Sequence, residues 1–95
     1  MQYVVCYDIV SDDAGDARRS RISNALLDFG KRIQDSVFVA DLDEELAARM
    51  RARIEPLIDA RTDRLHVFAL CAACEGRVWR AGLAELPEDA LFYIL

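Results

Sequence analysis

The fold is decided by residues 3–16, which read Tyr3-Val4-Val5-Cys6-Tyr7-Asp8-Ile9-Val10 and then Ser11-Asp12-Asp13-Ala14-Gly15-Asp16. Most of the first eight residues are β-branched or aromatic, which is typical of a strand buried on both faces. The next six are turn formers, and their aspartates are candidate N-caps of a helix. This stretch therefore predicts a buried strand that leads through a turn into a helix.

Downstream, apolar residues repeat first at helical and then at strand spacing. The first helix should carry its buried face on Ile22, Ala25, Leu26 and Phe29. Gly30 follows directly, so we expect a left-handed residue to end this helix there. Residues 32–40 alternate between apolar and polar side chains and predict a strand.

A second helix and further strands complete the prediction. Asp43 can cap a helix that breaks near Pro56 and has a buried stripe of Leu46, Met50, Ile54, Leu57 and Ile58. Strands are expected at residues 65–71, 78–80 and 92–95. We interpret the order as β-α-β-β-α-β with an additional C-terminal strand, an α+β, ferredoxin-like fold with both helices on one face of the sheet.

The chain is short and rich in apolar residues. Its 95 residues are 54% hydrophobic and 31% charged, so we expect one ordered domain over residues 1–95 rather than a disordered acidic segment. An apolar strand at residues 92–95 either folds onto its own sheet or pairs with a second copy of the chain. Pairing would also stabilise a domain this small, which favours a homodimer.

The composition also bears on location and on partners. The longest uncharged apolar run covers residues 67–74, far too short to span a membrane, and the first residues have no secretory signal, so we expect a cytoplasmic protein. A net charge of −5 argues against indiscriminate attraction to nucleic acid. Five of the 12 Lys and Arg residues, however, lie within residues 18–32, where Asp28 is the only acid, which leaves room for a local basic face.

Three cysteines argue against a secreted disulfide framework. Cys71 and Cys74 form a Cys-x-x-Cys pair, but a structural zinc site needs four ligands, and Cys6 and His66 are the only further Cys or His in the sequence. A thioredoxin-type pair should open a helix after a strand, whereas this pair is expected where a strand ends in a turn. We interpret Cys71 and Cys74 as buried, reduced thiols.

Asp8 is the unusual residue of the first strand, where it shares a face with Val4, Cys6 and Val10. A carboxylate there needs a cation, a set of hydrogen bonds or solvent. It either caps the following turn or binds a metal. Because Mg²⁺ often uses only one or two protein carboxylates, two copies of Asp8 across a twofold axis would meet its requirement.

A candidate phosphate-binding set accompanies Asp8. It consists of Arg18, Arg19 and Arg21 in the first turns of the helix, and Arg32, Gln34 and Ser36 on one face of the next strand. Guanidinium groups give bidentate phosphate contacts, so this set suits a phosphodiester, although each arginine alone also fits a solvated helix flank. His66 is a conceivable general base or a structural residue of its strand.

Taken together, these residues resemble a known family. Tyr7-Asp8-Ile9, Asp12-Asp13, residues 18–22 (Arg-Arg-Ser-Arg-Ile) and residues 30–38 (Gly-Lys-Arg-Ile-Gln-Asp-Ser-Val-Phe) are similar to the CRISPR-associated "Cas-two" family. Its members are small metal-dependent nucleases that partner the spacer integrase. The resemblance covers nearly the whole chain and implies a homodimer in which the last strand completes the partner's sheet.

The resemblance also implies site residues and partners. Asp8 of each protomer would be the catalytic residue and would hold one divalent metal, Mg²⁺ or Mn²⁺, that activates water for cleavage of RNA or DNA. Positions linked to activity or substrate contact correspond here to Tyr7, Arg19, Arg21, Arg32 and Phe38. In spacer acquisition for antiviral defence, the dimer would hold duplex DNA beside the integrase.

Two features depart from the family pattern. The turn at residues 11–16 is longer, with Gly15 inserted, and Asp35 is acidic where many members are basic or neutral. Two other classes stay open: a toxin-like ribonuclease of the related virulence-associated family, and a non-catalytic ferredoxin-like module. A repeat array and an integrase gene nearby would exclude the toxin, and tight duplex DNA binding would count against a small-molecule regulatory module. The absence of an aromatic RNA-recognition motif disfavours an RNA-recognition module.

Overall fold

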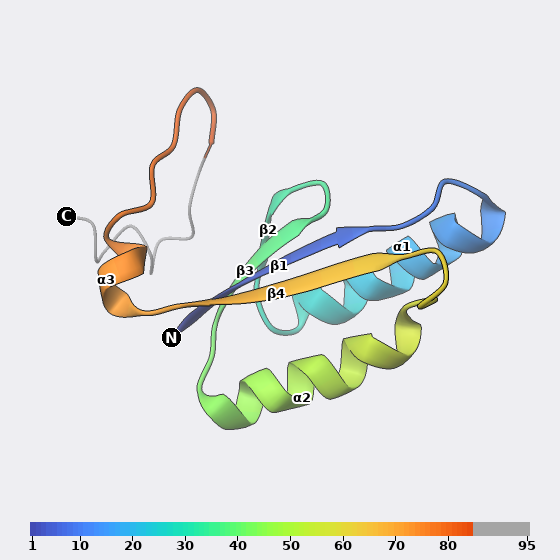
Figure 1. Cartoon of the computed structure of the whole chain (residues 1–95), viewed down its shortest axis with the longest axis horizontal. Helices are drawn as coiled ribbons and strands as arrows, with labels where there is room; N and C mark the ends of the chain where they lie inside the picture. Colours follow the sequence, from blue (N-terminus) through green and yellow to red (C-terminus); the bar gives the residue numbers. More distant parts are fainter. Residues whose placement is uncertain (85–95) are drawn as a thin grey trace.

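The computed structural model describes residues 1–84. The elements are, in chain order, strand β1 (Gln2–Asp8), helix α1 (Asp13–Leu27), strands β2 (Lys31–Gln34) and β3 (Val37–Asp41), helix α2 (Glu44–Ile54), the 3-10 helix η1 (Glu55–Leu57), strand β4 (Arg64–Leu70) and the short helix α3 (Ala72–Glu75). The strands form an antiparallel sheet in the order β2-β3-β1-β4. Helices α1 and α2 lie on the same side of it (Figure 1). The predicted ferredoxin-like α+β arrangement is confirmed.

The alternation of β1 separates the two faces of the sheet. Val5 and Tyr7 point toward the helices and are buried, whereas Val4 and Cys6 are half-buried and Asp8 is exposed on the opposite face. The core between sheet and helices contains the fully buried side chains Phe38, Ile22, Leu26, Met50, Ile54 and Val5. Hydrophobic burial on this one face therefore fixes which side of β1 each residue presents.

Side-chain caps fix where both long helices begin. The Asp12 carboxylate accepts a hydrogen bond from the Gly15 backbone N–H at 2.6 Å, and the Asp43 carboxylate accepts one from the Leu46 N–H at 2.8 Å. Each carboxylate satisfies one N–H group that has no partner within its helix, and its charge complements the helix dipole. Because Asp12 holds the start of α1, the turn after Asp8 has a defined course.

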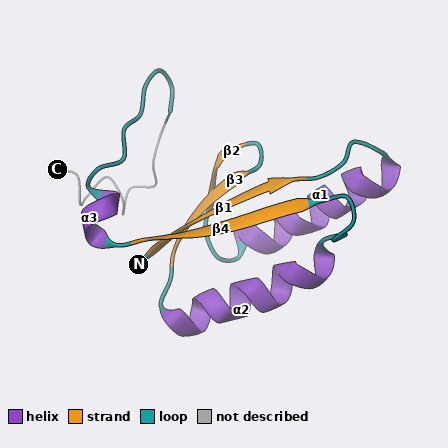
Figure 2. Ribbon diagram, viewed as in Figure 1, coloured by secondary structure: helices purple, strands orange, loops and turns teal. Residues whose placement is uncertain are grey.

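Several predicted elements differ from the structure. Residues 32–40 form two strands, not one, because the chain reverses at Asp35 and Ser36 (Figure 2). Gly30 is not left-handed; glycine is needed there because a Cβ would collide with the Val39 carbonyl oxygen. In α2 the buried positions are Ala47, Met50 and Ile54, and Leu46 is 39% exposed.

Of the two strands predicted nearest the C-terminus, one is wrong and the other is not tested. Residues 78–80 are not a strand; no strand of the described sheet runs beside them, and Trp79 is 84% exposed. The strand predicted at residues 92–95 lies outside the described residues. Within residues 1–84, none of the helices has the length and apolar character needed to cross a membrane.

Candidate functional site

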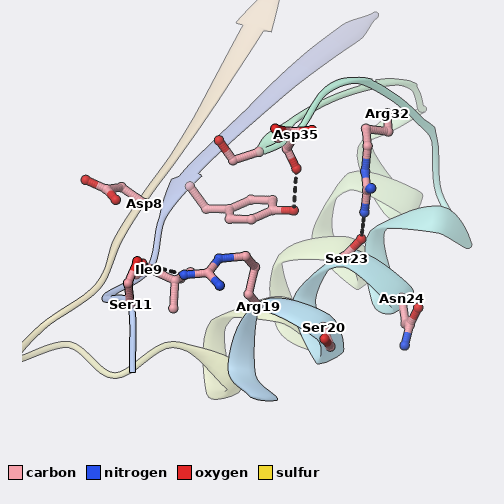
Figure 3. A pocket seen from close by; sticks show the side chains of 11 residues that line it. Asp8, Ile9, Ser11, Arg19, Ser20, Ser23, Asn24, Arg32 and Asp35 are labelled. Carbon is pink, nitrogen blue, oxygen red and sulfur yellow. Dashed lines mark hydrogen bonds between the residues drawn. The ribbon is translucent and has the colours of Figure 1, made fainter. Parts of the chain in front are cut away.

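An open groove of about 670 Å³ lies at the end of β1, where the chain turns into α1 (Figure 3). Its walls come from the end of β1 and the residues that follow it, from the middle of α1 and from the β2–β3 hairpin. The lining residues are Tyr7, Asp8, Ile9, Ser11, Arg19, Ser20, Ser23, Asn24, Arg32, Asp35 and Ser36. The groove thus brings together five of the ten candidate residues singled out from the sequence, namely Tyr7, Asp8, Arg19, Arg32 and Ser36.

Tyr7 joins β1 to the β2–β3 hairpin. Its backbone N–H donates to the Ser36 carbonyl at 3.1 Å, and its hydroxyl donates to the Asp35 carbonyl at 3.3 Å. Its ring lies 6.3 Å from the ring of Phe38, centroid to centroid. The side chain is buried apart from the hydroxyl end, so Tyr7 shapes the groove wall from within the core.

Arg19 and Arg32 hold the two sides of the groove. Arg19 donates to the Ile9 carbonyl at 2.8 Å and pairs with Asp16 at 2.7 Å. Arg32 donates to the Ser23 hydroxyl, and its guanidinium carbon lies 5.4 Å from the centre of the Phe38 ring. Both side chains are partly or fully exposed to solvent, so each positions neighbouring backbone or side chains while its remaining N–H groups stay available to an anion.

Asp8 lies at the rim, not inside the groove. Its side chain points away from Arg19 and Arg32 (Figure 3), because alternation places it on the face opposite to Tyr7. Its register partner on β4 is Arg64, which is also exposed on that face. Among residues 1–84 the Asp8 carboxylate has no ion-pair partner within 4.0 Å, so solvent satisfies it.

Arg18 is engaged inside the protein. Its guanidinium binds both oxygens of Asp63, with Nε–Oδ2 at 2.8 Å and Nη2–Oδ1 at 3.1 Å. The Asp63 carboxylate also accepts from the backbone N–H of Asp59 at 2.9 Å and of Val10 at 3.4 Å. The Arg18 guanidinium holds the pKa of the Asp63 carboxyl well below its usual range, and the two N–H groups act in the same direction against the effect of burial. This ion pair therefore fastens the segment after Asp8 to the turn before β4.

The remaining singled-out residues lie outside the groove lining. Arg21 is exposed on α1, and Phe38 is 1% exposed in the core beneath Arg32. His66 is exposed on β4 and stacks on Phe68, with ring centroids 5.9 Å apart. The His66 side chain therefore lies in solvent and is not part of the groove lining.

The pair does follow the end of a strand, since β4 ends at Leu70, but the interpretation of the two cysteines as buried thiols in a turn is wrong. Cys71 and Cys74 are both exposed, and a helix, α3, begins directly after Cys71. The physical reason is that α3 caps the end of β4 at the edge of the sheet, where nothing in residues 1–84 covers it. Cys6 is the half-buried cysteine of the three.

A single protomer offers few ligands for a metal ion near Asp8. In the part of the chain that the structure describes, no three His, Cys, Asp or Glu residues gather to hold an ion. A single protomer therefore supplies Asp8 alone, whereas a hard cation such as Mg²⁺ accepts one or two carboxylates and keeps several waters. One carboxylate is within this range, so Asp8 fits as a ligand of a hydrated ion, and a second copy of the chain would supply a second carboxylate.

Three residues of the site were missed by sequence reasoning. Arg64 faces Asp8 across the sheet, Asp63 binds Arg18, and Ser23 binds Arg32. The strand register that pairs Arg64 with Asp8 has no local signal in the sequence. A signal did exist for Ser23, since it lies one helical turn from Arg19 and therefore on the same face of α1.

Comparison with known proteins gives a consistent result. The family described as "CRISPR associated protein Cas2" matches residues 1–78. A CRISPR-associated endoribonuclease Cas2 of Rhodospirillum rubrum is 40% identical over 76 residues, covering 80% of this chain and 58% of that protein. A Chloroflexus aurantiacus protein with the same description is 35% identical, covering 95% of this chain and 94% of its own length.

Solved structures agree with these relatives. The crystal structure of Streptococcus pyogenes Cas2 superimposes with a TM-score of 0.77 at 28% identity, covering 86% of this chain and 100% of that one. A hypothetical protein of Thermus thermophilus gives a TM-score of 0.75 at 37% identity, covering 90% of this chain and 95% of that one. The similarity thus extends through both the sequence and the fold.

Proposed function

The chain belongs to the CRISPR-associated Cas2 family, and we propose that it is a divalent-metal-dependent endonuclease that works as a homodimer in spacer acquisition. The observation that carries the nuclease proposal is the exposed Asp8 carboxylate at the end of β1, beside a groove with two arginines. A carboxylate that is exposed and has no ion-pair partner within residues 1–84 has both oxygens available to a cation. Arginines nearby suit the phosphates of a nucleic acid.

The metal would be Mg²⁺ or Mn²⁺, held by Asp8 of both protomers. When bound, such an ion offsets the charge of a phosphodiester and makes water a better nucleophile. The chain's own contribution is placement: Arg19 holds the Ile9 carbonyl directly after Asp8, and the Asp12 cap fixes the turn that follows. Asp8 thereby sits at a defined point of the sheet face.

A homodimer is supported by the face of the sheet opposite to the helices. Val4, Cys6 and Val37 are half-buried there, and Phe68 is 52% exposed. Apolar side chains on an open sheet face are typical of a surface that packs against a partner. Because Asp8 is on the same face, apposition of two sheets would also bring the two carboxylates toward each other.

Nucleic acid would be held by arginines that reach solvent. Arg21 is exposed on α1, and Arg19 and Arg32 border the groove. We propose that these three side chains take phosphates, whereas Tyr7, Phe38 and Arg18 support them from inside the fold. Phosphate contacts of this kind weaken as salt rises, since binding releases counterions.

The nuclease proposal is tested with the purified protein and labelled RNA, single-stranded DNA and duplex DNA. We expect cleavage with Mg²⁺ or Mn²⁺, none after chelation, and loss of cleavage in Asp8→Asn. The matched control is Asp41→Asn, which removes an exposed carboxylate at the other end of the sheet and should leave the rate unchanged. Cleavage by Asp8→Asn at the rate of the unchanged protein would overturn the assignment of Asp8.

The role in spacer acquisition is tested separately. We expect the protein to bind duplex DNA and to co-elute with the CRISPR integrase of its own locus, with Asp8→Asn retaining both properties. Light scattering should give twice the mass of the 95-residue chain. A monomer that binds neither duplex DNA nor the integrase would overturn this part of the proposal. The nuclease proposal would be judged separately, by the cleavage test.

A further inference from the structure

The Cys-x-x-Cys pair lies at the opposite end of the sheet from Asp8. Gln2 pairs with Leu70 at one end of β1 and β4, and Asp8 pairs with Arg64 at the other. Cys71 follows Leu70, and α3 extends from it at that far end (Figure 1). The pair is therefore separate from the groove and from the proposed nuclease function.

The local backbone places the two thiols on one turn. Cys71 has extended dihedral angles and directly precedes the first residue of α3, and Cys74 is the third residue of that helix. The Glu75 N–H donates to the Cys71 carbonyl at 2.9 Å and closes this turn. Residues three apart on a turn have neighbouring Cβ atoms, which is the spacing that a disulfide can close with a small adjustment.

The turn is anchored to the sheet. The buried Glu75 carboxylate accepts a hydrogen bond from the Gln2 backbone N–H at 2.8 Å, so α3 is fixed at the start of β1. Both thiols remain exposed. Two accessible thiols held together on an anchored turn are pre-organised to react with each other.

The two sulfurs also differ in acidity. The Cys74 backbone N–H, followed by the Cys74 thiol, lowers the pKa of the Cys71 thiol, and contact with Cys71 raises the pKa of the Cys74 thiol. A thiolate attacks disulfides and a thiol does not. Cys71 is thus suited to attack first and Cys74 to resolve the intermediate.

We propose that Cys71 and Cys74 are a redox site that forms a reversible intrachain disulfide by exchange with low-molecular-weight disulfides such as oxidised glutathione. The Cys71 thiolate attacks one sulfur of the small disulfide, forms a mixed disulfide and releases one small thiolate, which takes up a proton. Cys74 then loses its proton and attacks the Cys71 sulfur, which releases the second small thiol. Two electrons pass from the protein dithiol to the small disulfide, and added reduced thiol reverses both steps.

The test equilibrates the protein with graded ratios of oxidised to reduced glutathione, blocks free thiols with an alkylating reagent and measures intact mass. We expect the unchanged protein to lose two alkylation sites and to show an intrachain Cys71–Cys74 peptide on mapping. Cys6→Ser is the matched control, because it removes the third thiol and should keep the disulfide.

Single variants separate the two roles. Cys74→Ser should accumulate a mixed disulfide at Cys71, since no thiol resolves it, whereas Cys71→Ser should form a mixed disulfide severalfold more slowly. A disulfide between chains, a disulfide that involves Cys6, or equal rates for the two single variants would overturn the proposal. Peptide mapping of the unchanged protein tests the same point without any variant.

Discussion

Arg18 and Asp63 form a two-pronged ion pair across 45 residues of sequence, with Nε–Oδ2 at 2.8 Å and Nη2–Oδ1 at 3.1 Å. The Asp63 side chain is 0% exposed and that of Arg18 is 17% exposed. A buried carboxylate is tolerated here because the guanidinium and three further donors surround it. The pair joins α1, the turn before β4 and Val10, which lies two residues after Asp8, into one unit.

Acid should release this unit. The folded pKa of Asp63 lies below its unfolded value, which is about 3.9, so its contribution to stability is complete above that value and is lost as pH falls through the folded pKa. We expect the free energy of unfolding of the unchanged protein to fall more steeply below about pH 4 than that of Asp63→Asn. Urea unfolding at a series of pH values measures both slopes.

The control for the acid series is Glu45→Gln. Glu45 pairs with Arg49 at 2.8 Å on the exposed face of α2, where solvent screens the interaction. We expect this variant to follow the unchanged protein at every pH. Parallel curves for Asp63→Asn and the unchanged protein would show that the Asp63 carboxylate has no special acid sensitivity.

Arg64 should weaken metal binding at Asp8. The two residues are register partners on one face, with neighbouring Cβ atoms about 5 Å apart. A unit positive charge about 5 Å from a divalent ion repels it by about 1.5 kcal/mol in water, and because the exposed guanidinium can also extend farther from the ion, roughly tenfold in affinity at low salt is the upper end of the effect. We expect Arg64→Gln to lower the Kd for Mn²⁺ by up to about tenfold, as measured by calorimetry.

Salt and a second arginine provide the controls for that measurement. The difference should shrink at high ionic strength, and Arg49→Gln, on α2, should leave the Kd unchanged. An Mn²⁺ affinity that is the same with and without Arg64 at low salt would place the ion somewhere other than Asp8.

Local pattern was enough for the first strand, for both long helices with their N-caps and for the strand before Cys71, but not for the β2–β3 hairpin. Asp35 and Ser36 are turn formers, but the turn contains neither glycine nor proline, and this signal was too weak to divide the single strand expected over residues 32–40 into two strands. What holds the reversal in place is a contact from elsewhere, since Ser36 and Asp35 accept hydrogen bonds from Tyr7.

The candidate site was only partly predictable for the same reason. Arg18 and Arg19 are adjacent members of one basic run, yet Arg18 pairs with Asp63 and Arg19 borders the groove. That division depends on which residues the turn at 59–63 brings against α1, a tertiary contact without local signal. Similarly, α3 has four residues, too few for an apolar period to reveal the helix that opens at Cys71.

Gly15 should be essential to the course of the turn after Asp8. A Cβ at this position would collide with the Val10 carbonyl oxygen, a backbone atom that cannot swing aside. We expect Gly15→Ala to lower the free energy of unfolding by about 1–3 kcal/mol, despite the better helix propensity of alanine. Gly76→Ala is the control, since its Cβ would meet nothing closer than 3.7 Å, and it should be neutral or slightly stabilising. Equal urea midpoints for the two variants would contradict this reading of the turn.

Substitutions of Phe38 should affect nucleic-acid binding only by lowering the folding stability of the protein. It is 1% exposed, and Arg32 lies between its ring and solvent, with the guanidinium carbon 5.4 Å from the ring centre. We expect Phe38→Ala to cost about 3–5 kcal/mol of unfolding free energy, whereas Phe38→Leu should stay folded at moderate temperature. At a temperature where Phe38→Leu is folded, titration with duplex DNA should give this variant the same Kd as the unchanged protein.

Arg32→Gln provides the contrast that makes the Phe38 result interpretable. Removing one phosphate contact should weaken binding for every sequence tested and reduce the slope of log K against log salt by about 1. Phe38→Leu should leave that slope unchanged, because a buried ring releases no counterion. A folded Phe38→Leu protein that fails to bind duplex DNA would instead mean that the ring reaches the nucleic acid, which requires the β2–β3 hairpin to open around Tyr7 and Asp35 when substrate binds.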